Sequence, residues 1–224
     1  MIVKYMLNWN RTGNRMTKER VVSKLKQVRG ISMREKIVET AERYFCEKGY
    51  FAATSRKLAD AAGISIGSFY FYFKDKEELL LEVYRKQSGR FIITVAAAYE
   101  NTGLYKTDRR EWLGTFIRQL LETYGNSGKL RAELKAVTWK NSYIAEQKAI
   151  IKKETVAAMM QLFTTSPVLD DVHVHHPDVA LLFVIDIMDA AYERIAAGGT
   201  PEEREAVIQE CTDLLYRYLF SRCD

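Results

Sequence analysis

Proline, cysteine and histidine are scarce in this sequence, which holds three residues of each type among 224. All three prolines fall in the second half of the chain. Cys46, Cys211 and Cys223 are odd in number and widely spaced, a pattern that indicates neither a disulfide framework nor a zinc finger. Cys46 has helical periodicity with its neighbours, so we interpret it as a packing or surface residue rather than a redox sensor.

Long hydrophobic runs are also missing. The longest, such as Ala180 to Ile185, are far shorter than the roughly 20 apolar residues that cross a bilayer. The stretch from Met1 to Leu7 is too short for a signal peptide and no small-residue cleavage pattern follows it. With 47% hydrophobic and 28% charged residues, the composition is that of a folded protein. We therefore expect a cytoplasmic protein with no membrane association.

Catalytic motifs are missing too, since the sequence has no Gly-rich phosphate loop, no Gly-x-Ser-x-Gly and no His-Glu-x-x-His. His173, His175 and His176 lie near several aspartates, a set that suggests a metal site. Because they fall in an expected loop, solvated histidines are the favoured interpretation. We expect no catalytic activity, no metal and no cofactor.

The charge distribution is uneven along the chain. Residues 1–76 hold 16 Lys/Arg and 7 Asp/Glu, a net charge of +9, whereas residues 77–224 hold 18 and 22, a net charge of −4. A basic amino-terminal part favours a polyanionic partner, because Lys and Arg set against phosphates release condensed counterions. Most of this charge lies in residues 1–30, so charge alone also fits a basic tail that aids solubility.

The residue patterns from Ser32 onward predict an all-α chain, with no convincing strand pattern. Ser32 and Glu35 have capping-box spacing and predict a first helix that ends at Gly49. Thr54 and Ser65 are the expected caps of two short helices. Further helices are predicted at 75–99, 108–124, 129–163 (one or two), 178–197 and 201–219, with loops at 101–107, 125–128, 164–177 and 198–200. We expect a basic arm at 1–30, a three-helix head at 31–78 and a larger helical body at 79–224.

The segment from Thr54 to Lys76 predicts a helix-turn-helix. Gly63 permits a tight turn between the two short helices, and Ile64 is placed to pack beneath it. On a helical wheel, Phe69 and Phe73 face inward, toward Leu58 and Phe45. The opposite side presents Gly67, Tyr70, Phe71 and Lys74, and exposed aromatic rings there favour a partner that covers them, such as DNA.

Residues 33–81 resemble the amino-terminal domain of the TetR family of transcriptional regulators. The resemblance rests on motifs at fixed spacing: Gly49, Thr54, Leu58-Ala59, Ala62-Gly63-Ile64-Ser65, Gly67-Ser68-Phe69-Tyr70, Phe73 and Lys74-Asp75-Lys76-Glu77-Glu78-Leu79. It implies a sequence-specific DNA-binding regulator, a repressor that a small-molecule inducer releases from DNA. Its partners would be a pseudo-palindromic double-stranded DNA operator and a second copy of the chain.

The resemblance also implies which residues contact DNA. Thr54, Ser55, Tyr70 and Lys76 would hold phosphates, and Arg56 would reach a base or the backbone. The full expected set is Thr54, Ser55, Arg56, Ser65, Ile66, Gly67, Ser68, Tyr70, Phe71, Tyr72, Lys74 and Lys76. Ile66 stands where many members have a polar or basic residue, and Phe71 where they often have an aromatic residue or His, so hydrogen-bond readout of bases is expected to be sparse.

The body is expected to dimerise and to bind the inducer. The resemblance implies a four-helix dimer interface built from the helices at 178–197 and 201–219 of two subunits. Aromatic and methionine side chains in the body either fill its core or line an apolar inducer pocket. The candidates for the pocket are Trp112, Phe116, Trp139, Tyr143, Met159, Phe163 and Phe183.

Two alternative functions remain open at this stage. An all-helical ligand-binding protein or enzyme without specific DNA recognition would have no reason to assemble the outward set Arg56, Tyr70, Phe71, Tyr72 and Lys76. A non-specific nucleoid-type binder would instead use the basic arm at 1–30 and ignore DNA sequence.

Overall fold

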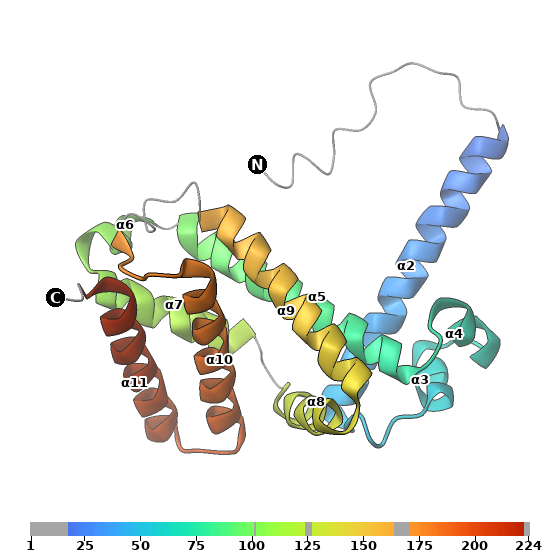
Figure 1. The fold of residues 1–224 in the computed structure, drawn as a ribbon. Coiled ribbons are helices and arrows are strands. Elements are labelled where there is room, and N and C mark those ends of the chain that lie inside the picture. The colour runs from blue at the N-terminus through green and yellow to red at the C-terminus, as the bar shows by residue number, and fades with distance from the viewer. Residues whose placement is uncertain (1–17, 101, 124–126, 164–170, 222–224) are drawn as a thin grey trace.

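A computed structural model describes residues 18–100, 102–123, 127–163 and 171–221. The described residues are almost entirely helical and contain no strand, which confirms the predicted all-α architecture. Figure 1 shows a small group of helices at one end, a pair at the other end, and two long helices between them. None of the described helices combines the length and the apolar content needed to cross a membrane.

The head consists of α2 (Lys18–Glu47), α3 (Ser55–Ala62) and α4 (Ile66–Tyr72). The prediction that a helix starts at Ser32 is wrong, because α2 runs without a break from Lys18 through that position. A Ser-x-x-Glu spacing fits a helix interior as well as a cap, and no proline precedes it to force a start. Part of the predicted arm is therefore helical, while residues 1–17 lie outside the described residues.

The turn between α3 and α4 has the geometry that the sequence predicts. Gly63 ends α3 in the left-handed region, with φ of 68° and ψ of 37°. The N–H of Gly63 donates to Asp60 O at 3.0 Å and the N–H of Ile64 donates to Ala59 O at 3.0 Å. These two bonds satisfy carbonyls at the helix end, and a residue with a Cβ would strain at this φ.

Aromatic packing holds the three head helices together. Phe45 from α2, Leu58 from α3 and Phe69 from α4 are almost completely buried in one cluster, together with Phe73. The prediction that Phe69 and Phe73 face inward is confirmed. Burial of each such side chain contributes about 1.5–3 kcal/mol, so the short α3 and α4 depend on this core rather than on helix propensity.

The remaining helices follow the prediction closely. They are α5 (Lys76–Glu100), α6 (Thr102–Thr107), α7 (Arg109–Thr123), α8 (Gly128–Lys140), α9 (Ser142–Phe163), α10 (Pro177–Ala196) and α11 (Pro201–Phe220). The predicted loop at 101–107 is wrong, because most of it forms the short helix α6. In Figure 1, α5 and α9 run side by side along the length of the molecule, and α10 and α11 form a pair at its far end.

The buried residues of the described ranges form two hydrophobic clusters, while the predicted boundary between head and body at residue 78 stays a prediction. The first contains the head residues, but also Leu130, Leu134 and Val137 of α8 with Ile144 and Ile151 of α9. The second joins α7, α10 and α11 to the far parts of α5 and α9. Helix α8 therefore packs with the head, and α5 and α9 span both clusters.

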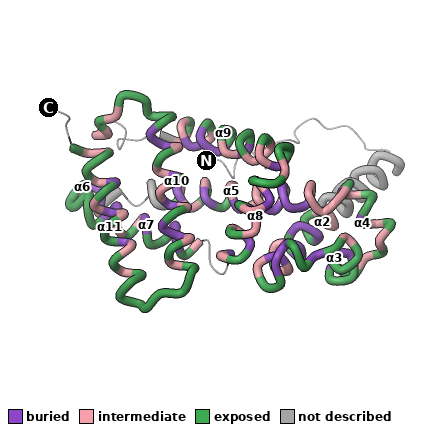
Figure 2. Tube along the Cα trace, turned by 60° about the horizontal axis from the view of Figure 1, so that its bottom comes forward, coloured by how far each residue is buried: buried purple, intermediate pink, exposed green. Residues whose placement is uncertain are grey.

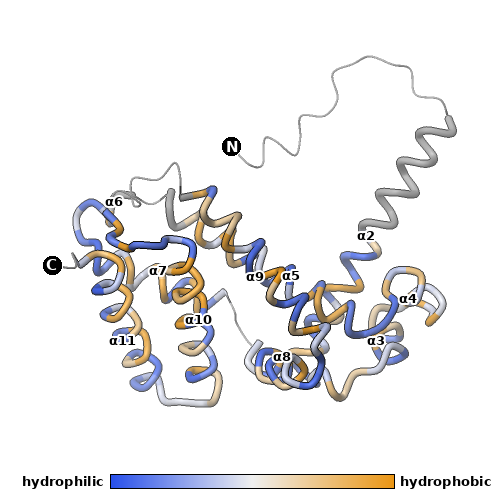
Figure 3. The backbone as a smooth tube through the Cα atoms, in the orientation of Figure 1, coloured by the Kyte–Doolittle hydropathy of each residue, from blue (hydrophilic) through white to orange (hydrophobic). Residues whose placement is uncertain are grey.

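Helix α11 begins with a complete capping box. Thr200 accepts a hydrogen bond from the N–H of Glu203 at 3.3 Å, and the Glu203 carboxylate accepts one from the N–H of Thr200 at 2.8 Å. Pro201 occupies the first turn, where its missing N–H costs no hydrogen bond. Apolar and polar residues alternate around this helix in Figure 3, as expected for one that packs on one side only.

Candidate DNA interface and ligand cavity

The start of α3 presents polar groups at the surface. Thr54 is extended, with φ of −127° and ψ of 156°, and its hydroxyl accepts a hydrogen bond from the N–H of Lys57 at 3.2 Å. This confirms the predicted cap. Arg56 is exposed and Ser55 is half-buried. The positive end of the helix dipole and a guanidinium therefore face solvent together, an arrangement suited to phosphate.

Helix α4 has one buried and one exposed side. The Ser65 hydroxyl accepts from the N–H of Ser68 at 3.0 Å and starts the helix. From there the side chains of Tyr70 and Phe71 point outward, 56% and 81% exposed, and Gly67 and Lys74 are exposed as well. Figure 2 shows exposed residues along the outer side of α4. The outward set predicted from the helical wheel is confirmed.

Ile66 and Tyr72 are less accessible than the sequence suggests. Both are half-buried and pack against the head core. A seven-residue helix has too few turns for periodicity to separate its flanks from its exposed side, and packing against the head core decides the outcome. Their expected contacts with DNA stay predictions, and each can present only part of its side chain.

Lys76 has a role in holding the head together that the sequence did not suggest. Its ammonium donates to Tyr50 O at 3.4 Å and to Ala53 O at 3.2 Å, and it lies 4.2 Å from the centroid of the Tyr50 ring. These contacts tie the start of α5 to the loop before α3. The expected phosphate contact of Lys76 is therefore in competition with three contacts inside the protein.

Tyr50 is the residue on which this arrangement depends, and the sequence analysis missed it. Its hydroxyl donates to Glu77 Oε1 at 2.7 Å, and its ring packs edge-on against Phe45 with centroids 5.6 Å apart. Burial, and then the hydrogen bond to Glu77, raise the pKa of Tyr50 well above its usual value. A buried aromatic just after the helix-ending Gly49 was the available signal.

A shallow surface groove brings the two halves of the motif together. Its lining residues come from the loop before α3, from both short helices and from the start of α5: Ala53, Thr54, Ser55, Arg56, Ile66, Tyr70, Asp75, Lys76 and Glu77. Arg56 and Tyr70, fourteen positions apart, thus share one surface. A cation beside an exposed tyrosine is a combination that binds phosphate and base edges.

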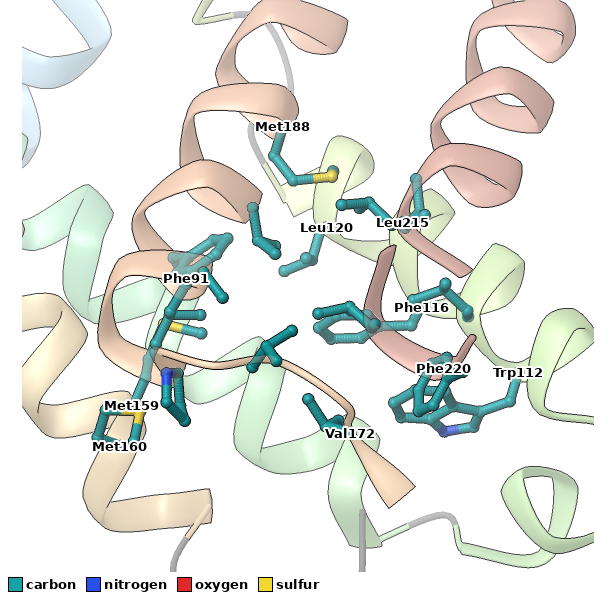
Figure 4. Close-up of a pocket in the computed structure, with 18 residues that line it drawn as sticks. Phe91, Trp112, Phe116, Leu120, Met159, Met160, Val172, Met188, Leu215 and Phe220 are labelled. Carbon is teal, nitrogen blue, oxygen red and sulfur yellow. The ribbon is translucent and has the colours of Figure 1, made fainter. Parts of the chain in front are cut away.

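An apolar cavity of about 100 Å³ lies inside the second hydrophobic cluster (Figure 4). The residues that line it are Phe91, Trp112, Leu113, Phe116, Ile117, Leu120, Met159, Met160, Val172, Val174, Pro177, Ala180, Leu181, Val184, Met188, Leu215, Leu219 and Phe220. Trp112 and Phe116 are stacked, with ring planes 5° apart and centroids separated by 5.6 Å. No charged side chain is among these lining residues, so the cavity suits a hydrocarbon group.

The structure brings three of the candidate ligand residues to this cavity, namely Trp112, Phe116 and Met159. It corrects the placement of Trp139, Tyr143 and Phe183, which lie outside the cavity with more than half of each side chain exposed. Spacing along a helix shows which residues share a side, but not which side faces a cavity. The side chain of Phe163 lies outside the described residues.

The sequence analysis missed several residues that close the cavity. Phe91 of α5 and Leu215 and Phe220 of α11 all line it. In the sequence, each of these residues is an apolar position at helical spacing, which was the available signal for burial. What the sequence did not show is that these helices converge on one point.

The three histidines lie on the surface and do not gather. His173, His175 and His176 are exposed, and the backbone N–H of His173 donates to Leu219 O at 2.8 Å. Within the described ranges, no three His, Cys, Asp or Glu side chains are close enough to hold a metal ion.

Comparisons with known proteins agree with this geometry. The family model described as "Bacterial regulatory proteins, tetR family" matches residues 37–83, which span the head. The HTH-type transcriptional repressor AcnR of Corynebacterium diphtheriae is 27% identical over 181 residues, which cover 78% of this chain and 87% of that protein. The match therefore extends well beyond the head.

Solved structures share the fold of most of the chain. A TetR-family transcriptional regulator from Mesorhizobium loti superposes with a TM-score of 0.65 at 18% identity, covering 86% of this chain and 98% of its own. FadR of Bacillus subtilis, solved in complex with stearoyl-CoA, gives a TM-score of 0.63 at 18% identity, covering 82% and 98%. With the exposed side of α4, the matched motif and the shared fold, this chain carries the DNA-binding domain of the tetR family of bacterial regulatory proteins and is a DNA-binding transcriptional regulator.

Proposed function

We propose that this protein is a homodimeric repressor of transcription, which binds a pseudo-palindromic operator and leaves it when an apolar small molecule enters the body. The observation that carries the proposal is the exposed side of α4, where Tyr70 and Phe71 project into solvent and Tyr70 shares a groove with Arg56. Large apolar rings are rarely exposed together without a partner. The major groove offers such a partner through phosphates and thymine methyl groups.

The proposed dimer is supported by the outer surfaces of α10 and α11. Val179 and Phe183 are exposed one turn apart on α10, and Leu214 and Tyr218 are exposed one turn apart on α11. Because the two helices pack against each other at the end of the molecule, a second copy could cover both rows at once. A two-fold protein would then place its two α4 helices in successive major grooves, about one DNA turn apart.

Repression is the favoured effect on transcription, because occupancy of a promoter is enough to block it. The relative AcnR is named a transcriptional repressor, which supports the same direction. A cytoplasmic location, where the DNA of a bacterium lies, and the absence of any catalytic activity belong to the same proposal. The alternative of a ligand-binding protein or enzyme does not account for the exposed rings on α4.

The proposed ligand site is the apolar cavity. FadR was solved with stearoyl-CoA, a molecule with a long hydrocarbon chain, and the lining of this cavity suits such a chain. At about 100 Å³ the cavity is smaller than the roughly 300–1,000 Å³ of typical ligand sites. A ligand would therefore push its walls apart, and α5 and α9 in those walls also contribute to the head cluster. Release from DNA would follow from tighter ligand binding to the opened form.

Selection of bound fragments from random double-stranded DNA tests the proposal. We expect a two-fold motif whose half-sites lie about one turn apart. Phe71→Ala should abolish the selection while leaving the fold intact. Ile93→Ala, which removes another exposed apolar side chain, 68% exposed on α5, is the matched control and should select the same motif. Enrichment of no motif by the wild-type protein would contradict the proposal.

A further inference from the structure

A small polar pocket adjoins the apolar cavity. It measures about 30 Å³ and lies between α5, α8, α9 and α10, lined by Tyr84, Gln87, Ser88, Phe91, Arg131, Lys152, Thr155, Ile185 and Asp189. Phe91 lines both spaces. On α9, Thr155 lines the polar pocket and Met159, one turn later, lines the cavity. The two spaces therefore follow each other along α5 and α9.

The polar pocket contains more positive than negative charge. Arg131 is paired with Asp189 and Lys152 with Asp186, and the two basic side chains are only 12% and 22% exposed. Lys148 lies nearby, 5.7 Å from the Tyr84 ring. Three cations thus lie close to two carboxylates, of which Asp189 lines the pocket and Asp186 is 61% exposed.

The electrostatic behaviour of Lys148 shows that these charges interact. Burial is the main cause that lowers the pKa of Lys148, and the charges of Arg131 and Lys152 lower it further, whereas Asp189 opposes the shift. An additional anion would relieve this repulsion among cations. Tyr84 adds a hydroxyl group to the pocket. Burial raises the pKa of Tyr84 to about 12, so this hydroxyl is protonated at neutral pH.

We propose that this pocket binds the carboxylate of an amphipathic ligand whose hydrocarbon tail occupies the apolar cavity. The inference rests on the proposed ligand-controlled repression and names the chemical class of the ligand. A guanidinium and an ammonium, both largely buried, are the groups that bind a carboxylate most strongly. A space of about 30 Å³ fits a headgroup of a few atoms and excludes a nucleotide.

The same pocket connects the ligand to the head. Arg131 lies on α8, whose Leu130 and Leu134 are part of the head cluster. Its partner Asp189 lies on α10, which packs in the second hydrophobic cluster through Met188. A ligand carboxylate competes with Asp189 for Arg131 and with Asp186 for Lys152. Binding would therefore loosen the ion pairs that hold α10 to α8 and α9.

Binding of fatty carboxylates to the full chain tests the inference. The probes are straight-chain saturated carboxylates and the alcohols of the same chain length, titrated by calorimetry. We expect the best carboxylate to bind about tenfold or more tightly than its alcohol, the size of one charge-assisted interaction. Lys152→Gln should remove this preference and leave alcohol binding unchanged. Lys153→Gln, which removes an exposed charge from the next position of α9, should keep it.

Three outcomes would overturn the inference. One is equal affinity for carboxylates and alcohols in the wild-type protein, which would leave the apolar cavity as ligand site without a headgroup pocket. The second is an unchanged carboxylate preference in Lys152→Gln. The third is no binding of any carboxylate. All three leave operator binding intact, so they are distinguishable from failure of the proposed repression, which the DNA selection measures separately.

Discussion

The hydroxyl of Tyr50 donates a hydrogen bond to Glu77 at 2.7 Å and so joins the loop before α3 to the first turn of α5. The two residues are separated by the whole helix-turn-helix. Because the Tyr50 ring also contacts Phe45 and the ammonium of Lys76, the loop is fixed on three sides. The position of α3 against the rest of the head depends on this contact.

Replacing Tyr50 with phenylalanine should lower the free energy of unfolding by about 1 kcal/mol at neutral pH, the typical net value of one hydrogen bond. The folded protein raises the pKa of Tyr50 above the value of about 10 in the unfolded chain. The stabilisation is therefore complete below pH 10 and is lost as the pH rises above it. Urea unfolding between about pH 8 and 11 measures this, and the wild-type protein should lose more stability above pH 10 than Tyr50→Phe. Parallel curves for the two proteins would contradict the assignment.

Replacing Lys76 with alanine should affect the fold more than the DNA contact. The substitution removes two hydrogen bonds and the contact with the Tyr50 ring, so we expect a loss of about 1–3 kcal/mol in unfolding free energy. The slope of DNA affinity against salt should stay nearly unchanged. Urea unfolding and a salt titration by fluorescence anisotropy separate the two effects. A slope reduced by about one with unchanged stability would instead show a phosphate contact.

Replacing Arg56 with alanine should affect DNA binding more than the stability of the fold. Arg56 is exposed and lines the groove between α3 and α4, so its loss should leave stability unchanged. DNA affinity should fall by about 1–3 kcal/mol, with relaxed selectivity at one base pair. Arg194→Ala, an exposed arginine at the far end of the molecule, is the control and should bind as the wild type does. Wild-type affinity in Arg56→Ala would rule out this contact.

Alanine at Gly63 should destabilise the head although it creates no clash. No atom lies within 4 Å of a Cβ built there, so the effect comes only from the left-handed backbone, at about 1–2 kcal/mol. Gly89 of α5 offers a matched comparison, since the surrounding space is equally open and its backbone is helical. Gly89→Ala should stabilise by about 0.5–1 kcal/mol. Thermal unfolding of both variants measures whether stability falls in Gly63→Ala and rises in Gly89→Ala. A loss of stability in both variants would show that the left-handed backbone at Gly63 is not the cause.

Local signals explain which parts of the fold were predictable. The caps at Thr54 and Ser65 and the turn at Gly63 depend on residues within a few positions, so the sequence alone locates them. The predicted helix start at Ser32 was wrong because it also rested on a local signal, and this one is ambiguous. A serine and a glutamate three apart satisfy a cap or lie inside a helix, and only the unbroken α2 decides between these.

The site was less predictable where it depends on packing between distant helices. The outward Tyr70 and Phe71 follow from the period of α4, because Phe69 has to enter the core. The phosphate contact expected of Lys76 stays a prediction, and the contact of its ammonium with the Tyr50 ring has no local signal in the sequence. Likewise, Trp139 is more conspicuous in the sequence than Phe91, and yet Phe91 lines the cavity while Trp139 is 85% exposed on α8.

Glutamate at Phe183 should convert the proposed dimer into a monomer. Phe183 is 55% exposed on α10, so a charge there leaves the core of one subunit undisturbed. In a dimer that buries this surface, two carboxylates would be withdrawn from water without partners, at a cost of several kcal/mol. Sedimentation at micromolar concentration should show a dimer for the wild type and a monomer for Phe183→Glu. Trp139→Glu places the same charge at an exposed aromatic position on α8, so it should remain dimeric. Because two-fold operators require both heads, Phe183→Glu should also bind a full operator no more tightly than a half-site. A dimeric Phe183→Glu would exclude this surface of α10 from the interface.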